Sequence, residues 1–505
     1  MKLNQRKAGA ILSYISIFAN TIVQLLYTPF LVGKLGQSEY GLYSLVSSII
    51  GYLTILDLGF GNAIVVHTAK YRAIGDKKKE QTLHGMFHFI YIAIGVIAGV
   101  IGCIVALNSG NIFGATMSID EVQKMKTMLF ILSFNLFMTF AFSIYNAIIT
   151  ASEKFIFQKT LAIISTIAKP LLMIPVLFMG YKSIALCLII TAVNILVLFL
   201  NYYFCKKKMD VKIRFNGFDK ALFKTIFAYS FWIFLGVIAD KINWSADQTI
   251  LGIFCGTIAI SIYSIAATIN TLFINLSTAI SGVMLPKMSK MVAKNATKEE
   301  LSDELIKVGR MQYYIVFLMA SGFVLFGKEF IRLWVGEGFE EAYRVALLLV
   351  IPLCIPLIQN LGLSILQAMN KFKFRTILMS VMSIANIIAT VFLVQWKGAT
   401  GAAIGTAGSL IICNVIIMNI YYRRVIGLDI FRFWKNIIGM TIKFSIPVIV
   451  VMALTLLVKI NGLLSFTVSV LAYSAIFAIN AYLLCANEYE KKIVKRIAAR
   501  MHLVK

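Results

Sequence analysis

Three polar side chains recur at helical spacing inside one apolar stretch of the chain. Asp240, Asn243 and Asp247 are three and four residues apart, so a helix places them on one face, with Lys241 and Trp244 beside them. An ionisable group at the bilayer centre costs about 3 to more than 10 kcal/mol, so it usually faces a partner or a wet cavity. We expect these residues to line a cavity, Lys241 contacting an anionic group and Trp244 stacking on a sugar. The alternative is a structural pair in which Lys241 bridges to Asp247 or to a neighbouring helix.

A second set of polar positions lies in apolar stretches of the first half. Asn20 and Gln24 form a polar face in the first of these stretches. Lys169 lies deep in another and is followed by Pro170 and Pro175, which free backbone carbonyls that protein or water must then satisfy. We expect Asn20, Gln24 and Lys169 to line the same cavity. A kinked packing helix with a local ion pair is the alternative for Lys169.

The remaining candidates have ordinary structural explanations or lack a required partner. Asp57 lies toward the end of its apolar stretch, where a structural role beside the loop is an equal alternative to a place in the cavity. His84 and His88 have the spacing of the HExxH zinc motif, but Gly85 replaces its glutamate, and no GxxxxGK[ST] phosphate loop is present. We therefore expect no metal and no cofactor, and transport that runs on an ion gradient (H⁺ or Na⁺), a substrate gradient or another protein.

The composition shows what kind of element must hold these residues. Of 505 residues, 60% are hydrophobic and 14% charged, and the mean hydropathy is +0.86. A soluble domain is about 25% charged, so the apolar excess belongs in a bilayer. A bilayer core about 30 Å thick needs roughly 20 apolar helical residues, and fourteen stretches of the chain meet that length. We predict an all-α polytopic membrane protein with about 14 transmembrane helices.

The formal charge of +26 lies mainly in alternate loops. With fourteen spans, 36 of the 48 Lys and Arg residues fall on the side of the N-terminus. This asymmetry is the positive-inside signal, so we predict a multi-pass protein with both termini in the cytoplasm. The basic character is thereby explained by topology, and a nucleic-acid partner is not expected.

Two segments recur along the chain at nearly the same offset. Residues 36–45 parallel 256–265, a shift of 220, and residues 151–157 parallel 368–374, a shift of 217. Helices 1 to 6 then correspond to helices 7 to 12 in the same orientation. This parallel repeat predicts two six-helix bundles that rock about a central cavity, with a passive helical scaffold as the alternative. The predicted domains are a six-helix lobe over 1–204, a cytoplasmic linker over 205–225, a second six-helix lobe over 226–420, and helices 13 and 14 with a basic tail over 421–505.

Several short motifs resemble those of the polysaccharide and O-antigen (Wzx-type) flippases. They are Tyr27-Thr28-Pro29-Phe30-Leu31, Tyr40-Gly41-Leu42-Tyr43, Leu56-Asp57-Leu58-Gly59-Phe60-Gly61 and Asp247-Gln248-Thr249-Ile250-Leu251-Gly252. That family belongs to the multidrug/oligosaccharidyl-lipid/polysaccharide (MOP) exporter superfamily, and the resemblance runs from helix 1 through helix 12. It implies a MATE-like fold in the bacterial cytoplasmic membrane. It also implies movement of an undecaprenyl-pyrophosphate-linked oligosaccharide from the inner to the outer leaflet, for surface polysaccharide biosynthesis.

The resemblance also suggests roles and partners. The cationic side chains of Lys169 and Lys241 would contact the anionic pyrophosphate. An acid such as Asp240 would carry the coupling H⁺ or Na⁺. The expected partners are the lipid-linked oligosaccharide, membrane lipids, a glycan polymerase and other polysaccharide assembly proteins. Three alternatives remain open at this point: a cation-coupled multidrug exporter of the same superfamily, a membrane glycan polymerase or ligase, and a scramblase that needs no gradient.

Overall fold

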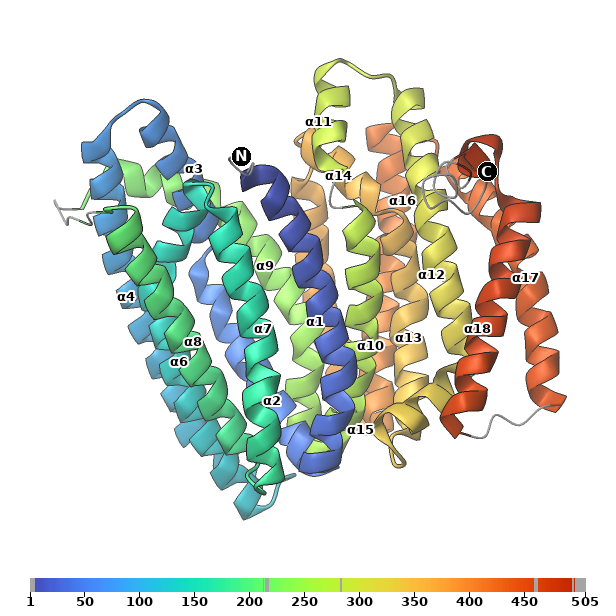
Figure 1. Ribbon diagram of the computed structural model, residues 1–505, viewed down its shortest axis with the longest axis horizontal. Coiled ribbons are helices and arrows are strands. Elements are labelled where there is room, and N and C mark those ends of the chain that lie inside the picture. Colours follow the sequence, from blue (N-terminus) through green and yellow to red (C-terminus); the bar gives the residue numbers. More distant parts are fainter. Residues whose placement is uncertain are drawn as a thin grey trace. The chain divides into compact units, whose positions relative to one another are not determined.

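The computed structural model describes residues 5–211, 213, 218–281, 284–457, 462–492 and 495. Within these ranges the regular structure is helical throughout, without a strand (Figure 1). This confirms the predicted all-α class. Because a helix satisfies its own backbone hydrogen bonds, long apolar sequences of this kind can be buried in hydrocarbon.

The described helices have the lengths of membrane crossings. Twelve helical stretches in the described part of the chain are long and apolar enough to span a bilayer. One of them, Lys373–Ile426, has 54 residues, about 81 Å at 1.5 Å per residue, which is enough for two crossings. Its helix turns at Lys397 and Gly398, where the backbone is not helical. Together with the 35-residue helix α9 (Lys220–Phe254), this arrangement is compatible with the fourteen predicted spans.

The chain divides into two compact units, of which unit 1 comprises Met1–Ile265 and Lys373–Ser409. In this unit α1 packs on α7, α4 packs on α6, and α9 packs on α2 and α3. Its elements are α1 (Gln5–Leu35), α2 (Gln37–Leu53), η1 (Thr54–Asp57), α3 (Phe60–Ala73), α4 (Lys77–Leu107), α5 (Ser109–Phe113), α6 (Ile119–Ala151), α7 (Phe155–Phe178), α8 (Ser183–Tyr203), η2 (Phe204–Lys208), α9, the start of α10 (Thr257–Ser281), and α15 (Lys373–Leu410) up to Ser409.

Unit 2 comprises Ala266–Phe372 and Leu410–Lys505. Here α12 is the central helix, and α13, α17 and α18 pack on it. The elements are the end of α10, α11 (Leu285–Ala293), α12 (Lys298–Val335), α13 (Glu340–Ile358), α14 (Asn360–Ala368), η3 (Ile411–Ile417), α16 (Met418–Tyr421), η4 (Tyr422–Ile426), α17 (Ile430–Leu457), α18 (Gly462–Asn480) and η5 (Ala481–Cys485). These units follow contacts rather than the repeat, and the domain boundaries at 204, 226 and 420 stay a prediction.

Two segments show local detail beyond simple apolar spans. The segment Gln37–Ala73 is one candidate membrane span, but it is divided into α2, η1 and α3 because Leu58 and Gly59 adopt left-handed backbone angles, with φ of 54° and 71°. The short helix α11 lies between α10 and α12, and the capping box of Thr297 and Glu300 starts the long helix α12.

Backbone geometry supports the internal repeat. Gly36 and Gly256, which the repeat aligns, both have φ of +80° and directly precede α2 and α10. Glu153 and Asn370, in the second aligned pair of segments, have φ of +53° and +55°. A non-glycine residue in this region is uncommon, so its presence at matched positions indicates that the two copies turn in the same way.

Candidate functional site

The best-defined polar cluster of unit 1 surrounds the carboxylate of Asp247. Asp247, on α9, has an exposed fraction of 0%. Its Oδ2 accepts hydrogen bonds from the hydroxyl of Tyr263 on α10 and from Thr406 Oγ1 on α15, the latter at 2.7 Å. Its Oδ1 accepts a longer bond of 3.4 Å from Thr390 Oγ1, also on α15. Asn386 Nδ2 donates to Thr406 Oγ1 over 3.2 Å, so three helices build one site.

The turn within α15 brings its two halves together at this cluster. Asn386 and Thr390 precede the turn at Lys397–Gly398, and Thr406 follows it. Close packing of the two halves depends on small residues. A Cβ added at Gly405 would lie 2.7 Å from Thr390 Oγ1, which is tighter than real Cβ contacts allow. Small residues at such positions let membrane helices approach closely, which here brings the hydroxyls to the carboxylate.

The cluster presents oxygen atoms and lacks a basic partner. Within the described part of the chain, no Lys, Arg or His lies within salt-bridge distance of Asp247. A buried carboxylate without a counter-charge is costly, so it is stabilised by taking up a proton or a cation. Asp247, Thr390, Thr406 and Asn386 place carboxylate, hydroxyl and amide oxygens together, which are the ligands that hard cations prefer.

The other residues expected on α9 are only partly described. Asp240, Asn243 and Trp244 lie in α9, but their side chains are outside the described set. Lys241 is half-buried, and its Nζ would lie 3.9 Å from a Cβ added at Gly51 on α2. It therefore faces the last turn of α2, and it is not paired with Asp247.

The positions expected in the first half lie apart from this cluster. Asn20 on α1 is exposed and Gln24 is half-buried. Lys169 is half-buried on α7, just before the two prolines that the helix contains. Asp57 has structural contacts: Oδ1 accepts a 3.0 Å bond from the Tyr91 hydroxyl, and the carboxylate accepts backbone N–H groups at the start of α3. The structural interpretation of Asp57 is thus the one that its contacts favour.

Charged side chains join the starts of α2, α6 and α10 at one end of unit 1. Glu39, which is buried, accepts a 2.8 Å hydrogen bond from Lys124. Glu121 Oε1 accepts hydrogen bonds from Ser38 Oγ, at 2.5 Å, and from Thr257 Oγ1, at 2.9 Å. We call these five residues the end network. It holds this end of the unit closed.

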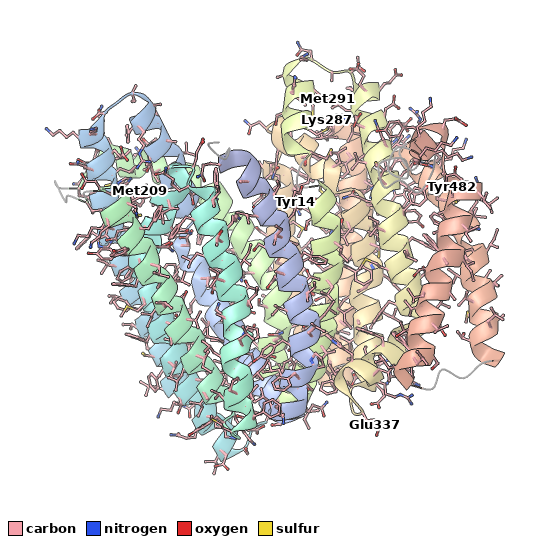
Figure 2. The ribbon with its side chains drawn as sticks, in the orientation of Figure 1. Tyr14, Met209, Lys287, Met291, Glu337 and Tyr482 are labelled. Atoms are coloured by element: carbon pink, nitrogen blue, oxygen red, sulfur yellow. The ribbon has the colours of Figure 1, made fainter. Side chains whose placement is uncertain are left out.

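A basic pocket lies at the opposite end of α6, beside the end of α3 and the start of α4. Its volume is about 730 Å³, and its lining includes Arg72, Lys77, Lys154 and Lys208. Figure 2 labels Met209, which lines the pocket just after η2. Arg72 is paired with Glu80 at 2.7 Å, which lies in the same pocket.

Sequence reasoning identified Asp247 but missed the residues that bind it. Tyr263, Thr390, Thr406 and Asn386 come from segments up to 159 positions away from it. Single hydroxyls and amides are common in membrane helices, so their types alone carried no signal. The sequence did contain one indication of the site, the spacing Gly401-x-x-x-Gly405. Two glycines four residues apart mark a close approach between membrane helices, here beside Asn386, Thr390 and Thr406.

The chain was compared with known protein families, relatives and solved structures. A family model described as "Polysaccharide biosynthesis protein" matches residues 34–344, more than half of the chain. The chain belongs to this family. The match spans Asp247 and Tyr263 together with the end network, and this family membership confirms the resemblance seen in the short motifs.

Two curated relatives match this family member over most of its length. The chain is 24% identical to the "Putative O-antigen transporter" of Shigella flexneri, covering 81% of this chain and 96% of the relative. It is 21% identical to the "Uncharacterized membrane protein EpsK" of Bacillus subtilis (strain 168), over 93% of each chain. The relatives thus match it along nearly their whole length.

The fold is that of known flippases and exporters. The structure of the lipid II flippase MurJ in an inward closed conformation matches with a TM-score of 0.73 and 17% identity, covering 94% of this chain and 98% of that one. An inward-facing multidrug resistance MATE transporter of the MOP superfamily matches with a TM-score of 0.63 and 13% identity, covering 85% and 99%. The family member therefore has the fold of MOP-superfamily transporters, and the matched proteins whose names state an activity are transporters or flippases rather than enzymes.

Proposed function

We propose that this protein moves an undecaprenyl-pyrophosphate-linked oligosaccharide from the inner to the outer leaflet of the bacterial cytoplasmic membrane by alternating access. The family match supports the cargo class, since the relative with 24% identity is named "Putative O-antigen transporter" and a lipid II flippase shares the fold. Both termini face the cytoplasm in this proposal. A glycan polymerase and other assembly proteins receive the product on the outer side.

The observation that carries the mechanism is the buried carboxylate of Asp247. Its hydroxyl partners come from α10 and α15, so its charge state affects how three helices pack. Binding of a cation there favours the arrangement in which Thr390 and Thr406 converge on it. A ligand shifts a conformational equilibrium only through such differential contacts. The coupling ion is sodium in our proposal, because a proton needs one oxygen whereas Asp247, Thr390, Thr406 and Asn386 together offer five.

The positively charged groups contact the pyrophosphate at different stages of transport in this proposal. The basic pocket of unit 1 meets the pyrophosphate on the cytoplasmic side, where the lipid-linked oligosaccharide is made. Lys241, beside the last turn of α2, and Lys169, before the proline pair of α7, then contact the pyrophosphate during passage. The end network keeps the outer end closed while the cargo loads.

A leaflet-access assay tests the proposal. Proteoliposomes containing the purified protein and a fluorescent undecaprenyl-pyrophosphate oligosaccharide are mixed with a membrane-impermeant lectin, and the exposed fraction is followed over time. We expect protein-dependent flipping that requires an inward-directed sodium gradient, and at least tenfold slower flipping for Lys241→Ala. Lys443→Ala is the matched control, since Lys443 binds the Leu484 carbonyl at 2.8 Å in unit 2.

The outcomes separate the alternatives. Equal rates for Lys241→Ala and wild type would remove Lys241 from the mechanism. Flipping that persists after all gradients are collapsed would indicate a scramblase. Resistance to cationic dyes on overexpression, without oligosaccharide flipping, would favour the multidrug exporter to which the MATE-like fold also points.

A further inference from the structure

An apolar groove runs along unit 2 between η3–η4 and α17, the warm-coloured helices near the C-terminal end in Figure 1. Its volume is about 930 Å³. One wall comes from η3, α16 and η4, and the other from the first half of α17. The lining is formed by Val415, Ile416, Asn419, Ile420, Arg423, Ile430, Phe431, Trp434, Lys435, Ile438, Gly439 and Ile442.

The groove has the length of one membrane leaflet. On α17 its lining extends from Ile430 to Ile442, which is about 18 Å of helix at 1.5 Å per residue. Half of a hydrocarbon core is about 15 Å thick. A ligand that fills the groove therefore reaches from the membrane surface to about the bilayer centre, as the acyl chain of a lipid in one leaflet does.

The two ends of the groove differ in chemistry. Arg423 and Lys435 lie in the half of the groove that contains the start of α17, and the lining contains no acidic residue. The Arg423 guanidinium is 5.9 Å from the Phe431 ring centroid, and within the described residues neither cation has a carboxylate at salt-bridge distance. The adjacent Arg432, in contrast, is paired with Asp303 at 2.8 Å. Two cations next to an apolar channel match a phosphate attached to a hydrocarbon chain.

The polar groups within the groove are already satisfied. Trp434 Nε1 donates to Asn419 Oδ1 over 3.0 Å, and Asn419 Nδ2 donates to the carbonyl groups of Asn414 and Val415. These carbonyls belong to η3, whose wide turns leave them available. The groove wall therefore offers no further polar partner, which favours a hydrocarbon occupant below the charged end.

We propose that this groove binds one anionic glycerophospholipid, with its phosphate on Arg423 and Lys435 and an acyl chain along α17. The bound lipid fills the space between α17 and η3–η4, since α17 otherwise packs on α12, α18 and η5. The site is separate from the Asp247 cluster, and it does not depend on the proposed cargo. In the proposed orientation it takes its lipid from the cytoplasmic leaflet, where anionic headgroups attract juxtamembrane Lys and Arg.

The test is lipid binding by the full-length protein in mild detergent, measured by native mass spectrometry. The probes are phosphatidylglycerol and phosphatidylcholine of matched acyl chains. We expect the wild-type protein to retain one phosphatidylglycerol tightly. The double variant Arg423→Gln with Lys435→Gln should bind it roughly 30-fold more weakly, since each basic residue near an anionic headgroup contributes about fivefold. Arg424→Gln is the matched control, because Arg424 neighbours Arg423 but does not line the groove.

A second variant tests the apolar part without changing charge. A Cβ added at Gly439 meets nothing within 4 Å, and Gly439 lines the groove, so Gly439→Leu adds apolar bulk to the groove from a position with open space at the Cβ. We expect it to fold with the wild-type melting temperature and to lose at least tenfold in phosphatidylglycerol affinity. Unchanged affinity in this variant would overturn the proposal.

Two further results would also overturn it. Equal retention of phosphatidylcholine would show ordinary contact with bulk lipid. Displacement of phosphatidylglycerol by equimolar undecaprenyl phosphate would assign the groove to the carrier lipid instead. Because binding is measured without transport, failure here leaves the proposed flippase function untouched, and failure of the flipping assay leaves this site untouched.

Discussion

Replacing Thr406 with valine tests whether the Asp247 cluster binds the coupling cation. Valine has nearly the same shape as threonine but lacks the hydroxyl that lies 2.7 Å from Asp247 Oδ2 and accepts the amide of Asn386. A hydrogen bond to a charged group contributes about 1.5–3 kcal/mol, and we take the lost cation ligand to be of the same order. At 1.4 kcal/mol per factor of ten, the sodium dissociation constant should rise about 10- to 150-fold.

The effect is measurable as stabilisation of the purified protein. A ligand present at 100 times its dissociation constant stabilises the folded state by about 2.7 kcal/mol. If the constant rises 30-fold, the same sodium concentration stabilises Thr406→Val by about 0.9 kcal/mol. The melting temperature is compared in sodium chloride and choline chloride at equal ionic strength. Sodium should raise it clearly for wild type and only slightly for the variant.

Thr191→Val is the matched control for this substitution. Thr191 is also a buried threonine of unit 1, but its hydroxyl donates to the carbonyl of Cys187 within α8. The control should keep the wild-type response to sodium. Identical sodium responses in wild type and Thr406→Val would refute the assignment, and a response to pH alone in wild type would replace sodium by a proton.

Three other substitutions probe the packing and the charges around the proposed mechanism. Gly405→Ala places a Cβ 2.7 Å from the Thr390 hydroxyl oxygen and should destabilise the fold by about 1–3 kcal/mol. The control Gly408→Ala, whose Cβ meets nothing within 4 Å, should leave the stability unchanged. Equal melting temperatures of the two variants would contradict the close approach of the two halves of α15. Burial raises the pKa of Glu490, but the charge and hydrogen bonds of Arg310, together with hydrogen bonds from the Asn487 backbone and Tyr314, hold the pKa below the usual 4.5. Glu490→Gln should therefore cost about 3–5 kcal/mol at pH 7, and this difference should shrink as the pH falls below about 4.5. A constant difference from pH 7 to pH 3 would contradict this account. The hydroxyl oxygens of Ser38 and Thr257 are 3.1 Å apart. The double variant Ser38→Cys with Thr257→Cys should form a disulfide on oxidation, and this disulfide should stop flipping until it is reduced. Undiminished flipping in the oxidised form would show that this end need not open.

The fold followed from the sequence because hydrophobic length and charge asymmetry act on every helix alike. The repeat was visible because tight turns restrict residue types, and the matched turns before α2 and α10 do share one backbone conformation. The break at Leu58 and Gly59 was not foreseen. A left-handed leucine is costly and is tolerated only where tertiary contacts hold it, here the bond between Asp57 and Tyr91.

The candidate site was harder to predict because its partners meet only through long-range packing. Asp247 stood out as an acid in an apolar stretch, but its neighbours depend on a close approach within α15 that Gly405 permits. Helical spacing placed Asp240 and Asn243 on one face with Asp247. It could not indicate that the Asp247 side chain points to α10 and α15 while Lys241 points to α2.

The repeat explains why the proposed cation site would occur once in a duplicated fold. Shifts of 220 and 217 align Asp247 with Tyr27 and Thr390 with Met173. In the first copy these two positions also touch, because the Tyr27 hydroxyl donates to Met173 Sδ over 2.9 Å. The same pair of helices therefore meets at the same pair of positions, with a phenol and a thioether in one copy and a carboxylate and a hydroxyl in the other. Since a thioether is a poor ligand for sodium, only the second copy can hold the ion, and we expect one sodium bound per protein and an unchanged sodium response in Tyr27→Phe.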